Sequence, residues 1–215
     1  MTYHHGNLRK ALLDRAVHVI AEQGIESLSL RALARDLGVS HAAPSRHFAD
    51  KAELLRALAT EGNDHFATYV LEAADQAGDD PLVRYAAMGK AYIRFSIDFP
   101  AYYRTITHPD VSSQADADLR ATGERRIHVI EDAARIAQAA GWLPDETTED
   151  VVMFSIATVR GVAAMLNDPL HGPTLQKNDA DALIETMVRL IIDPACPQKS
   201  LNPAKPTTKP KGKRT

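Results

Sequence analysis

The residues from Ser40 to Lys51 carry small and polar side chains at a spacing that suits contact with a nucleic acid. They read SHAAPSRH over 40–47, and Lys51 follows shortly after Phe48. A segment with no large apolar face presents its side chains outward, and the major groove of DNA admits a helix of this kind. The candidate DNA-binding residues are Ser29, Ser40, His41, Ala42, Ala43, Ser45, Arg46, His47 and Lys51.

The elements that would position this segment are two helices joined by a short turn. Ser29 stands at the N-cap of the first helix and Gly38 at its C′ position, and Ser40 is suited to cap a second helix over His41–His47. Pro44 lies inside this second helix, where it removes an N–H and disfavours helical geometry at Ala43. The pattern predicts a helix-turn-helix. The apolar face of its first helix would be Leu30, Leu33, Ala34 and Leu37, spaced i, i+3, i+4 and i+7.

Residues of about 6–66 resemble the N-terminal domain of the TetR/AcrR family of bacterial transcriptional regulators. The places that carry the resemblance hold Gly24, Ser29, Leu37-Gly38-Val39-Ser40, Ser45-Arg46-His47-Phe48 and Lys51. Ser45 stands where the family usually has Tyr. The resemblance implies a repressor that binds an inverted-repeat operator as a homodimer and is released by a small, largely apolar effector. The alternatives are an ordinary αα-hairpin in a helical core and a partner-binding adaptor whose helix-turn-helix no longer binds DNA.

The whole chain is expected to be all-α. A three-helix helix-turn-helix domain (6–66) would join a larger helical effector-binding and dimerisation domain (67–193), followed by a disordered basic tail (194–215). Asp50 with Glu53 reads as a capping box, and Asp80 before Pro81 as another helix start. Helices are expected from Asn7 to Gly24, over 51–78 and 81–100, over 112–140 before Gly141, and over 147–167 and 178–193.

Lys51 and the N-terminal arm each have two readings. Lys51 lies at a helix N-terminus, which favours an anion, so it is either a phosphate clamp or a solvated surface lysine. The arm Tyr3-His4-His5-Gly6 either lies on DNA or is a frayed terminus.

Five of the twelve aromatic residues (Phe, Tyr and Trp) gather over 92–103, and the family resemblance implies an effector pocket there. Residues 91–104 look like one C-terminal regulatory subclass, whose Trp-x-x-x-His-Gly signature is replaced here by Ile156, Arg160 and Gly161. Core packing is the alternative for any single residue. The pocket candidates are Met88, Tyr92, Phe95, Tyr102, Tyr103 and Phe154.

The last two long helices are apolar on more than one face and must be buried on several sides. A second copy of the chain would supply that burial through an isologous four-helix interface. The interface candidates are Val159, Val162, Leu166, Ile184, Met187, Val188 and Ile191.

Charge is segregated along the chain. Residues 1–60 hold eight Lys/Arg against six Asp/Glu, residues 61–193 eleven against twenty-two, and residues 194–215 six against none. The acidic middle would repel a polyanion, which directs DNA contact toward the ends. One cysteine, Cys196, and the lack of a long apolar run or signal sequence predict a soluble cytoplasmic protein without a membrane partner.

No enzyme motif appears in the sequence. It lacks G-x-S-x-G, a phosphate-binding glycine loop, H-E-x-x-H and paired cysteines. We therefore expect no catalytic residues, no cofactor and no metal, although a carboxylate or histidine pair assembled by the fold would leave no such motif.

Overall fold

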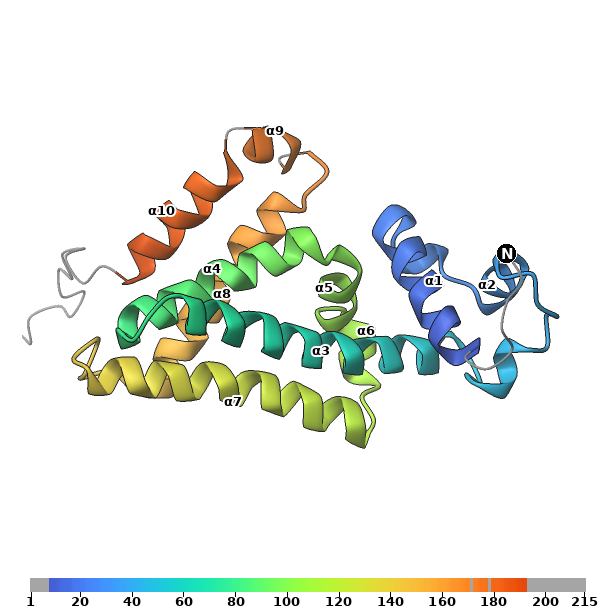
Figure 1. The fold of residues 1–215 in the computed structure, drawn as a ribbon, viewed down its shortest axis with the longest axis horizontal. Coiled ribbons are helices and arrows are strands. Elements are labelled where there is room, and N and C mark those ends of the chain that lie inside the picture. The colour runs from blue at the N-terminus through green and yellow to red at the C-terminus, as the bar shows by residue number, and fades with distance from the viewer. Residues whose placement is uncertain (1–7, 171, 178, 193–215) are drawn as a thin grey trace, which may run out of the picture.

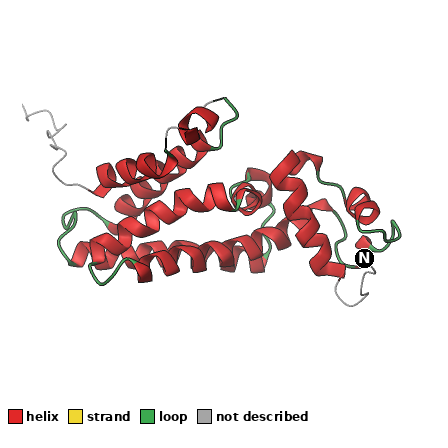
Figure 2. Ribbon diagram, turned by 45° about the horizontal axis from the view of Figure 1, so that its top comes forward, coloured by secondary structure: helices red, strands yellow, loops and turns green. Residues whose placement is uncertain are grey.

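The computed structural model describes residues 8–170, 172–177 and 179–192, which form helices and loops with no strand (Figure 1, Figure 2). The α-helices are α1 (Leu8–Gln23), α2 (Leu30–Asp36), α3 (Lys51–Gln76), α4 (Pro81–Asp98), α5 (Pro100–Ile106), α6 (Pro109–Ser113), α7 (Ala117–Ala139), α8 (Thr148–Leu166), α9 (Gly172–Lys177) and α10 (Ala180–Ile192). Two 3₁₀ helices, η1 (Ile25–Ser27) and η2 (Pro44–Arg46), lie in the N-terminal part. The predicted all-α fold is confirmed.

The N-terminal domain is a small helical unit with its own core. Helix α1 buries one face, α2 packs against it, and the first turns of α3 close the remaining side. The apolar spacing of α1 and α2 dictates this packing because residues three and four apart share a helix face. The most deeply buried side chains of this core are Leu12, Ala16, Ile20, Leu33, Phe48, Leu54 and Leu58.

Helix α3 connects the two domains without interruption. Its start is fixed by Asp50, whose carboxylate accepts from the Glu53 N–H at 2.8 Å, while Glu53 accepts in return from the N–H of Ala49 at 2.6 Å. Leu54 and Leu58 belong to the N-terminal core, whereas Phe66, Val70 and Ala74 belong to the second core. The predicted boundary at 66/67 therefore falls inside one continuous helix.

In the larger domain α4 and α7 pack on α3, α8 packs on α4 and α7, and α10 covers α4 and α8 from outside. Asp80 caps α4 by accepting from the N–H groups of Leu82 and Val83, both at 2.9 Å. Gly141 follows α7 with a φ of 103°, the left-handed geometry predicted for it. The predicted helices 51–78 and 147–167 are confirmed within two residues at each end.

Three short helices were not predicted. Helices α5 and α6 fill residues 100–113, and α9 precedes α10. The helix expected over 112–140 begins instead at Ala117, because Asp116 caps it by accepting from the Leu119 N–H at 2.9 Å.

Helix α5 packs against both domains, and its arginine is hydrogen-bonded to α1. The Arg104 guanidinium donates to the carbonyls of Ile20 and Ala21, at 2.8 and 3.0 Å, in the last turn of α1. A cation at a helix C-terminus also interacts favourably with the helix dipole. The end of α1 is thus tied to the larger domain.

Two predicted segments lie outside the described residues: the N-terminal arm and the basic tail from 194. Among the described helices, none has the length and apolar character needed to cross a membrane.

Candidate functional site

The segment predicted as the second helix of the helix-turn-helix has a different conformation. Residues 41–43 form a turn, and Pro44–Arg46 form a single 3₁₀ turn. The prediction of a helix over His41–His47 is therefore wrong in detail, and the reason is Pro44. Proline has no N–H to offer the Ser40 carbonyl, which instead accepts from the Ala43 N–H at 2.9 Å in a tighter turn. Ala43 itself keeps helical angles, φ −65° and ψ −42°, contrary to expectation.

Two buried residues hold this segment on the domain. The Pro44 ring and the Phe48 side chain are both buried, and Phe48 lies in the N-terminal core. The Phe48 N–H donates to the Pro44 carbonyl at 3.0 Å, which closes the segment into a compact loop. The Arg9 guanidinium lies 5.3 Å from the Phe48 ring centroid and covers it from the solvent side.

The predicted DNA-binding side chains lie mostly on the surface. Ala43 and Lys51 are half-buried, and the other seven residues (Ser29, Ser40, His41, Ala42, Ser45, Arg46 and His47) are exposed. Ser29 has the extended backbone of an N-cap, but its hydroxyl makes no capping hydrogen bond, so that part of the prediction is wrong. The Ser45 hydroxyl donates to the Ala42 carbonyl at 2.8 Å, so its oxygen can still accept a hydrogen bond.

Lys51 is at the first position of α3, beside a cleft of about 230 Å³ between the N-terminal domain and α6. Its ammonium group donates to the Glu26 carbonyl at 3.3 Å. Lys51 therefore stands at the positive end of a 26-residue helix, with donor capacity left for an anion.

Sequence reasoning omitted Arg31 from the candidate surface. It is exposed in the first turn of α2, two residues after Ser29. The signal was available, because Arg31 falls off the apolar stripe of that helix.

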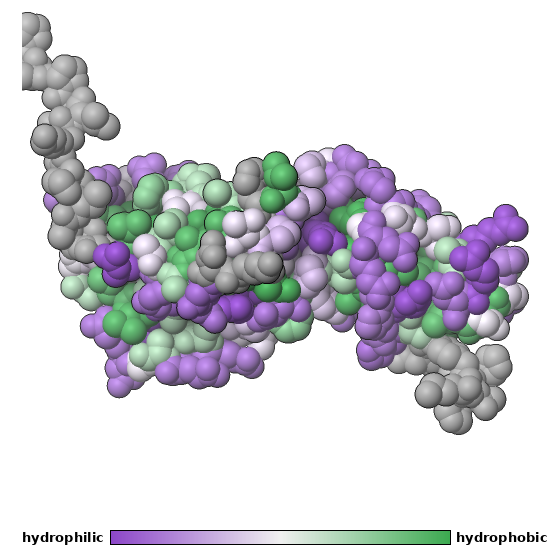
Figure 3. All heavy atoms as spheres, turned by 90° about the horizontal axis from the view of Figure 1, so that it is seen from above, coloured by the Kyte–Doolittle hydropathy of each residue, from purple (hydrophilic) through white to green (hydrophobic). Residues whose placement is uncertain are grey.

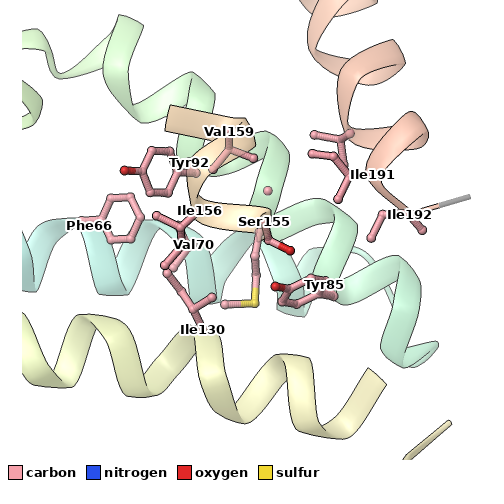
Figure 4. A pocket seen from close by; sticks show the side chains of 13 residues that line it. Phe66, Val70, Tyr85, Tyr92, Ile130, Ser155, Ile156, Val159, Ile191 and Ile192 are labelled. Carbon is pink, nitrogen blue, oxygen red and sulfur yellow. The ribbon is translucent and has the colours of Figure 1, made fainter. Parts of the chain in front are cut away.

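A small apolar cavity of about 40 Å³ lies in the core of the larger domain (Figure 4). That volume holds roughly three water molecules. Phe66 and Tyr92 lie together at one end of it, and Ile191 and Ile192 of α10 lie toward the other. The lining residues are Phe66, Val70, Tyr85, Met88, Gly89, Tyr92, Ile130, Ser155, Ile156, Val159, Val188, Ile191 and Ile192.

Only two of the predicted pocket residues, Met88 and Tyr92, line this cavity. Tyr103 lies behind Tyr92, with ring centroids 6.3 Å apart in an edge-to-face arrangement. Phe95 is fully buried against the Phe66 ring, outside the lining, and Tyr102 packs on α3, where its hydroxyl donates to Glu61 at 2.6 Å.

Phe154 is not in the cavity but on the outer surface of α8, where its side chain is 55% exposed. The sequence could not distinguish the faces of α8, since apolar residues occupy most of them. Phe66 and Ile130 of the cavity wall were not predicted, because they come from α3 and α7, whose placement beside α4 is a property of the fold. Tyr85 was also missed, although it lies on α4 itself, three residues before Met88.

Two hydroxyl groups interrupt the apolar wall. The hydroxyls of Tyr85 and Ser155 are buried, and neither has a hydrogen-bond partner of good geometry among the described residues. Burial raises the pKa of Tyr85, so this phenol stays protonated as a donor at neutral pH.

The predicted interface residues divide into two groups. Val159, Leu166, Ile184 and Val188 are buried inside the protomer, while Val162, Met187 and Ile191 are half-buried. A residue already buried within one protomer has no surface to offer a second. The apolar side chains that α8 and α10 leave exposed are instead Met153, Phe154, Met165 and Leu190, between 52 and 65% exposed. Figure 3, which faces α9 and α10, shows hydrophobic atoms gathered over the larger domain and a mostly hydrophilic N-terminal end.

Within the part of the chain that the structure describes, no group of three His, Cys, Asp or Glu side chains is placed to hold a metal ion.

Comparison with known families gives two matches. Residues 12–58 match the family described as bacterial regulatory proteins, tetR family, and residues 85–191 match a tetracyclin repressor-like C-terminal domain. A comparison with curated proteins found no match.

Several solved structures share the fold. A protein of unknown function from Rhodococcus sp. RHA1 is 30% identical, with a TM-score of 0.71 over 88% of this chain and 94% of the other. The fatty acid degradation regulator FadR from Bacillus halodurans is 14% identical, with a TM-score of 0.68 over 91 and 99%. AibR, solved with isovaleryl coenzyme A and operator DNA, is 18% identical, with a TM-score of 0.65 over 86 and 97%.

Proposed function

The chain belongs to the TetR family of bacterial regulatory proteins, and from this premise we propose that it is a repressor that responds to an effector. It binds an inverted-repeat operator as a homodimer, and a small, largely apolar molecule in the cavity of the larger domain releases it. The observation that carries the proposal is the exposed loop 40–47, whose serine, histidine and arginine side chains project from a domain with its own core.

The chemistry of this loop suits contact with DNA. Arg46 can donate two parallel hydrogen bonds to a guanine edge or a phosphate, and His47 can donate or accept. Lys51 at the N-terminus of α3 suits a phosphate, where the helix dipole adds to its charge. In this arrangement Arg46 reads sequence, whereas Lys51 positions the protein.

Dimerisation is proposed through the exposed face of α8 and α10, defined by Met153, Phe154, Met165 and Leu190. Four large apolar side chains on one pair of helices form the kind of surface that marks an interaction site. A twofold dimer would place two copies of the 40–47 loop on one duplex, and this matches an inverted repeat.

The effector must bind the conformation that does not bind DNA more tightly than the one that does, or it shifts nothing. The cavity of about 40 Å³ is too small for an effector as it stands. Its walls therefore move apart on binding, and this opening is the conformational change that we connect with release from DNA.

The experiment is selection from random duplexes with the full-length protein, followed by affinity measurements on the selected site. We expect a palindromic consensus. Lys51→Ala should weaken binding to the selected and unrelated duplexes by the same factor, whereas Arg46→Ala should also relax the consensus. Lys90→Ala is the matched control, because Lys90 pairs with Glu185 in the larger domain. A folded dimer with no preference for any duplex would reject the proposal and favour the adaptor.

A further inference from the structure

The helices around the cavity bring two arginines to the end of it that faces α5. Arg126 lies four residues before Ile130 on α7, and Arg160 lies four residues after Ile156 on α8. Residues four apart share a helix face, so each arginine is one turn from a side chain that lines the cavity. The Arg160 guanidinium donates to the Thr107 carbonyl at the end of α5, at 3.3 Å.

Aromatic rings separate these arginines from the apolar cavity. The Arg126 guanidinium lies 5.6 Å from the centroid of the Phe66 ring, and the Phe66 and Tyr92 rings meet edge to face at 5.1 Å. Burial lowers the pKa of Arg126, and the positive charge of Arg160 lowers it further, so the two charges act on one another. Burial raises the pKa of Tyr92, while both arginine charges oppose that rise.

The cluster formed by Arg126 and Arg160 has no acidic side chain paired with it among the described residues. Elsewhere on α7, Arg125 pairs with Asp64 at 2.9 Å and Arg135 with Asp132 at 2.6 Å. Arg126 and Arg160 have no carboxylate within ion-pair distance among the described residues, and the Arg126 Nε is buried with no hydrogen-bond partner there. This occurs in a segment, 61–193, that holds twice as many acidic residues as basic ones.

Two neighbouring cations, one of them largely withdrawn from water, are costly without an anion. The Phe66 ring supplies some attraction to Arg126, but a ring face does not use the N–H donors of a guanidinium. A planar guanidinium matches the oxygens of a carboxylate or phosphate in pairs. The cluster is therefore built to receive an anionic group from outside the described chain.

We propose that the effector is an amphipathic anion: its carboxylate or phosphate head binds Arg126 and Arg160, and its apolar chain runs past Tyr92 into the cavity. This inference rests on the proposed function and names the chemical class of its effector. Arg160 is exposed, so the head group lies nearest to solvent, while the chain enters the space lined by Phe66, Ile130 and Val188. Occupancy by the chain widens the cavity, and occupancy by the head competes with the Thr107 carbonyl for Arg160.

The test is direct binding to the full-length protein by calorimetry, without DNA. The probes are decanoate, decyl phosphate, decanol and decyltrimethylammonium, which share a chain and differ in the head. We expect at least one anion to bind about tenfold more tightly than decanol, equal to about 1.4 kcal/mol. The cation should bind more weakly than decanol. Whichever anion binds more tightly identifies the head group as carboxylate or phosphate.

Substitutions then locate the head group. Arg160→Gln and Arg126→Gln should each reduce the preference for the anion over decanol to less than about threefold, whereas Arg125→Gln should leave it unchanged. Arg125→Gln is the matched control, since it removes the same charge from the adjacent position. If Arg126→Gln fails to fold, the exposed Arg160 still provides the test.

Equal binding of decanoate, decyl phosphate and decanol would overturn the inference, as would an anion preference that survives Arg160→Gln. The outcome for the proposed function is separate. Anion binding by a protein that selects no duplex would leave the inference standing and reject the repressor. A specific operator complex in a protein that binds neither anion would support the repressor and reject the anion-binding inference.

Discussion

Replacing Val188 or Leu190 of α10 with Asp should separate folding from dimerisation. The Val188 side chain is 2% exposed and packs on α4 at Gly89. Its two methyl carbons each lie 3.6 Å from the position that a Cβ would take on Gly89. The Leu190 side chain is 52% exposed on the face proposed for the dimer. Both substitutions add one carboxylate to the same helix, so they differ mainly in what surrounds it.

The expected cost at Val188 has two parts. Losing the burial of a valine side chain costs about 1.5–3 kcal/mol. Enclosing a carboxyl group without a partner adds roughly 1–3 kcal/mol, even when its pKa rises enough to neutralise it. The sum, about 2.5–6 kcal/mol, corresponds to a fall in melting temperature of about 5–24 °C for a domain of this size. Leu190→Asp should lower the free energy of unfolding of the protomer by no more than about 1 kcal/mol, because half of that side chain is already in water.

The assay combines thermal melting, followed by circular dichroism, with light scattering at several protein concentrations. Dimerisation stabilises by mass action, so the melting temperature of the unchanged protein should rise with concentration. Leu190→Asp should abolish that rise and give monomers, whereas Val188→Asp should melt early at every concentration. If Val188→Asp melts within about 2 °C of the unchanged protein, the burial reasoning is wrong. If Leu190→Asp stays dimeric, the interface lies elsewhere.

Three further predictions concern packing, coupling and pH. A Cβ at Gly62 would lie 2.9 Å from the Ile106 Cγ2, so Gly62→Ala should lose about 1–2 kcal/mol in urea unfolding despite better helix propensity. Gly123→Ala, whose Cβ would meet nothing closer than 3.9 Å, should instead stabilise. Arg104→Gln should lower the free energy of unfolding by about 1–3 kcal/mol, because it removes two hydrogen bonds to carbonyls of α1. The same substitution should reduce the loss of operator affinity that effector binding causes. If the effector response is unchanged, α5 does not couple the two domains. Burial raises the pKa of Tyr103 to about 12, above its unfolded value of about 10. The buried, protonated phenol therefore contributes fully to the free energy of unfolding below about pH 10, and that contribution is lost as the pH rises toward 12. Melts at about pH 9 and about pH 11 should show the fall, and Tyr103→Phe should reduce it.

The helix starts were predictable because caps are local chemistry. Asp50, Asp80 and Thr147 each accept a backbone N–H at the start of the predicted helix, and Gly141 supplies the left-handed turn that ends α7. These signals depend on a few neighbouring residues, so they survive any arrangement of the rest of the chain.

Short helices and helix faces were less predictable. Helices α5 and α6 have seven and five residues and begin at prolines, so packing rather than periodicity holds them in place. Helices α8 and α10 are apolar on several faces, and no periodicity shows that Val188 points inward while Leu190 points outward. That Arg126 and Arg160 lie near the same cavity depends on how α7 packs on α8, which is a property of the fold alone.

One consequence follows from the continuity of α3, which belongs to both cores. It is a rod of 26 residues, and an uninterrupted helix transmits tilt rather than bending. Its length is about 39 Å, so a tilt of about 5° moves its far end by about 3.4 Å, the rise of one base pair. A tilt of a few degrees is therefore enough to move the loop 40–47 by the rise of one base pair. In a twofold dimer the two α3 helices tilt in opposite directions. The distance between the two 40–47 loops, which must match the spacing of the half-sites, therefore changes by twice that amount.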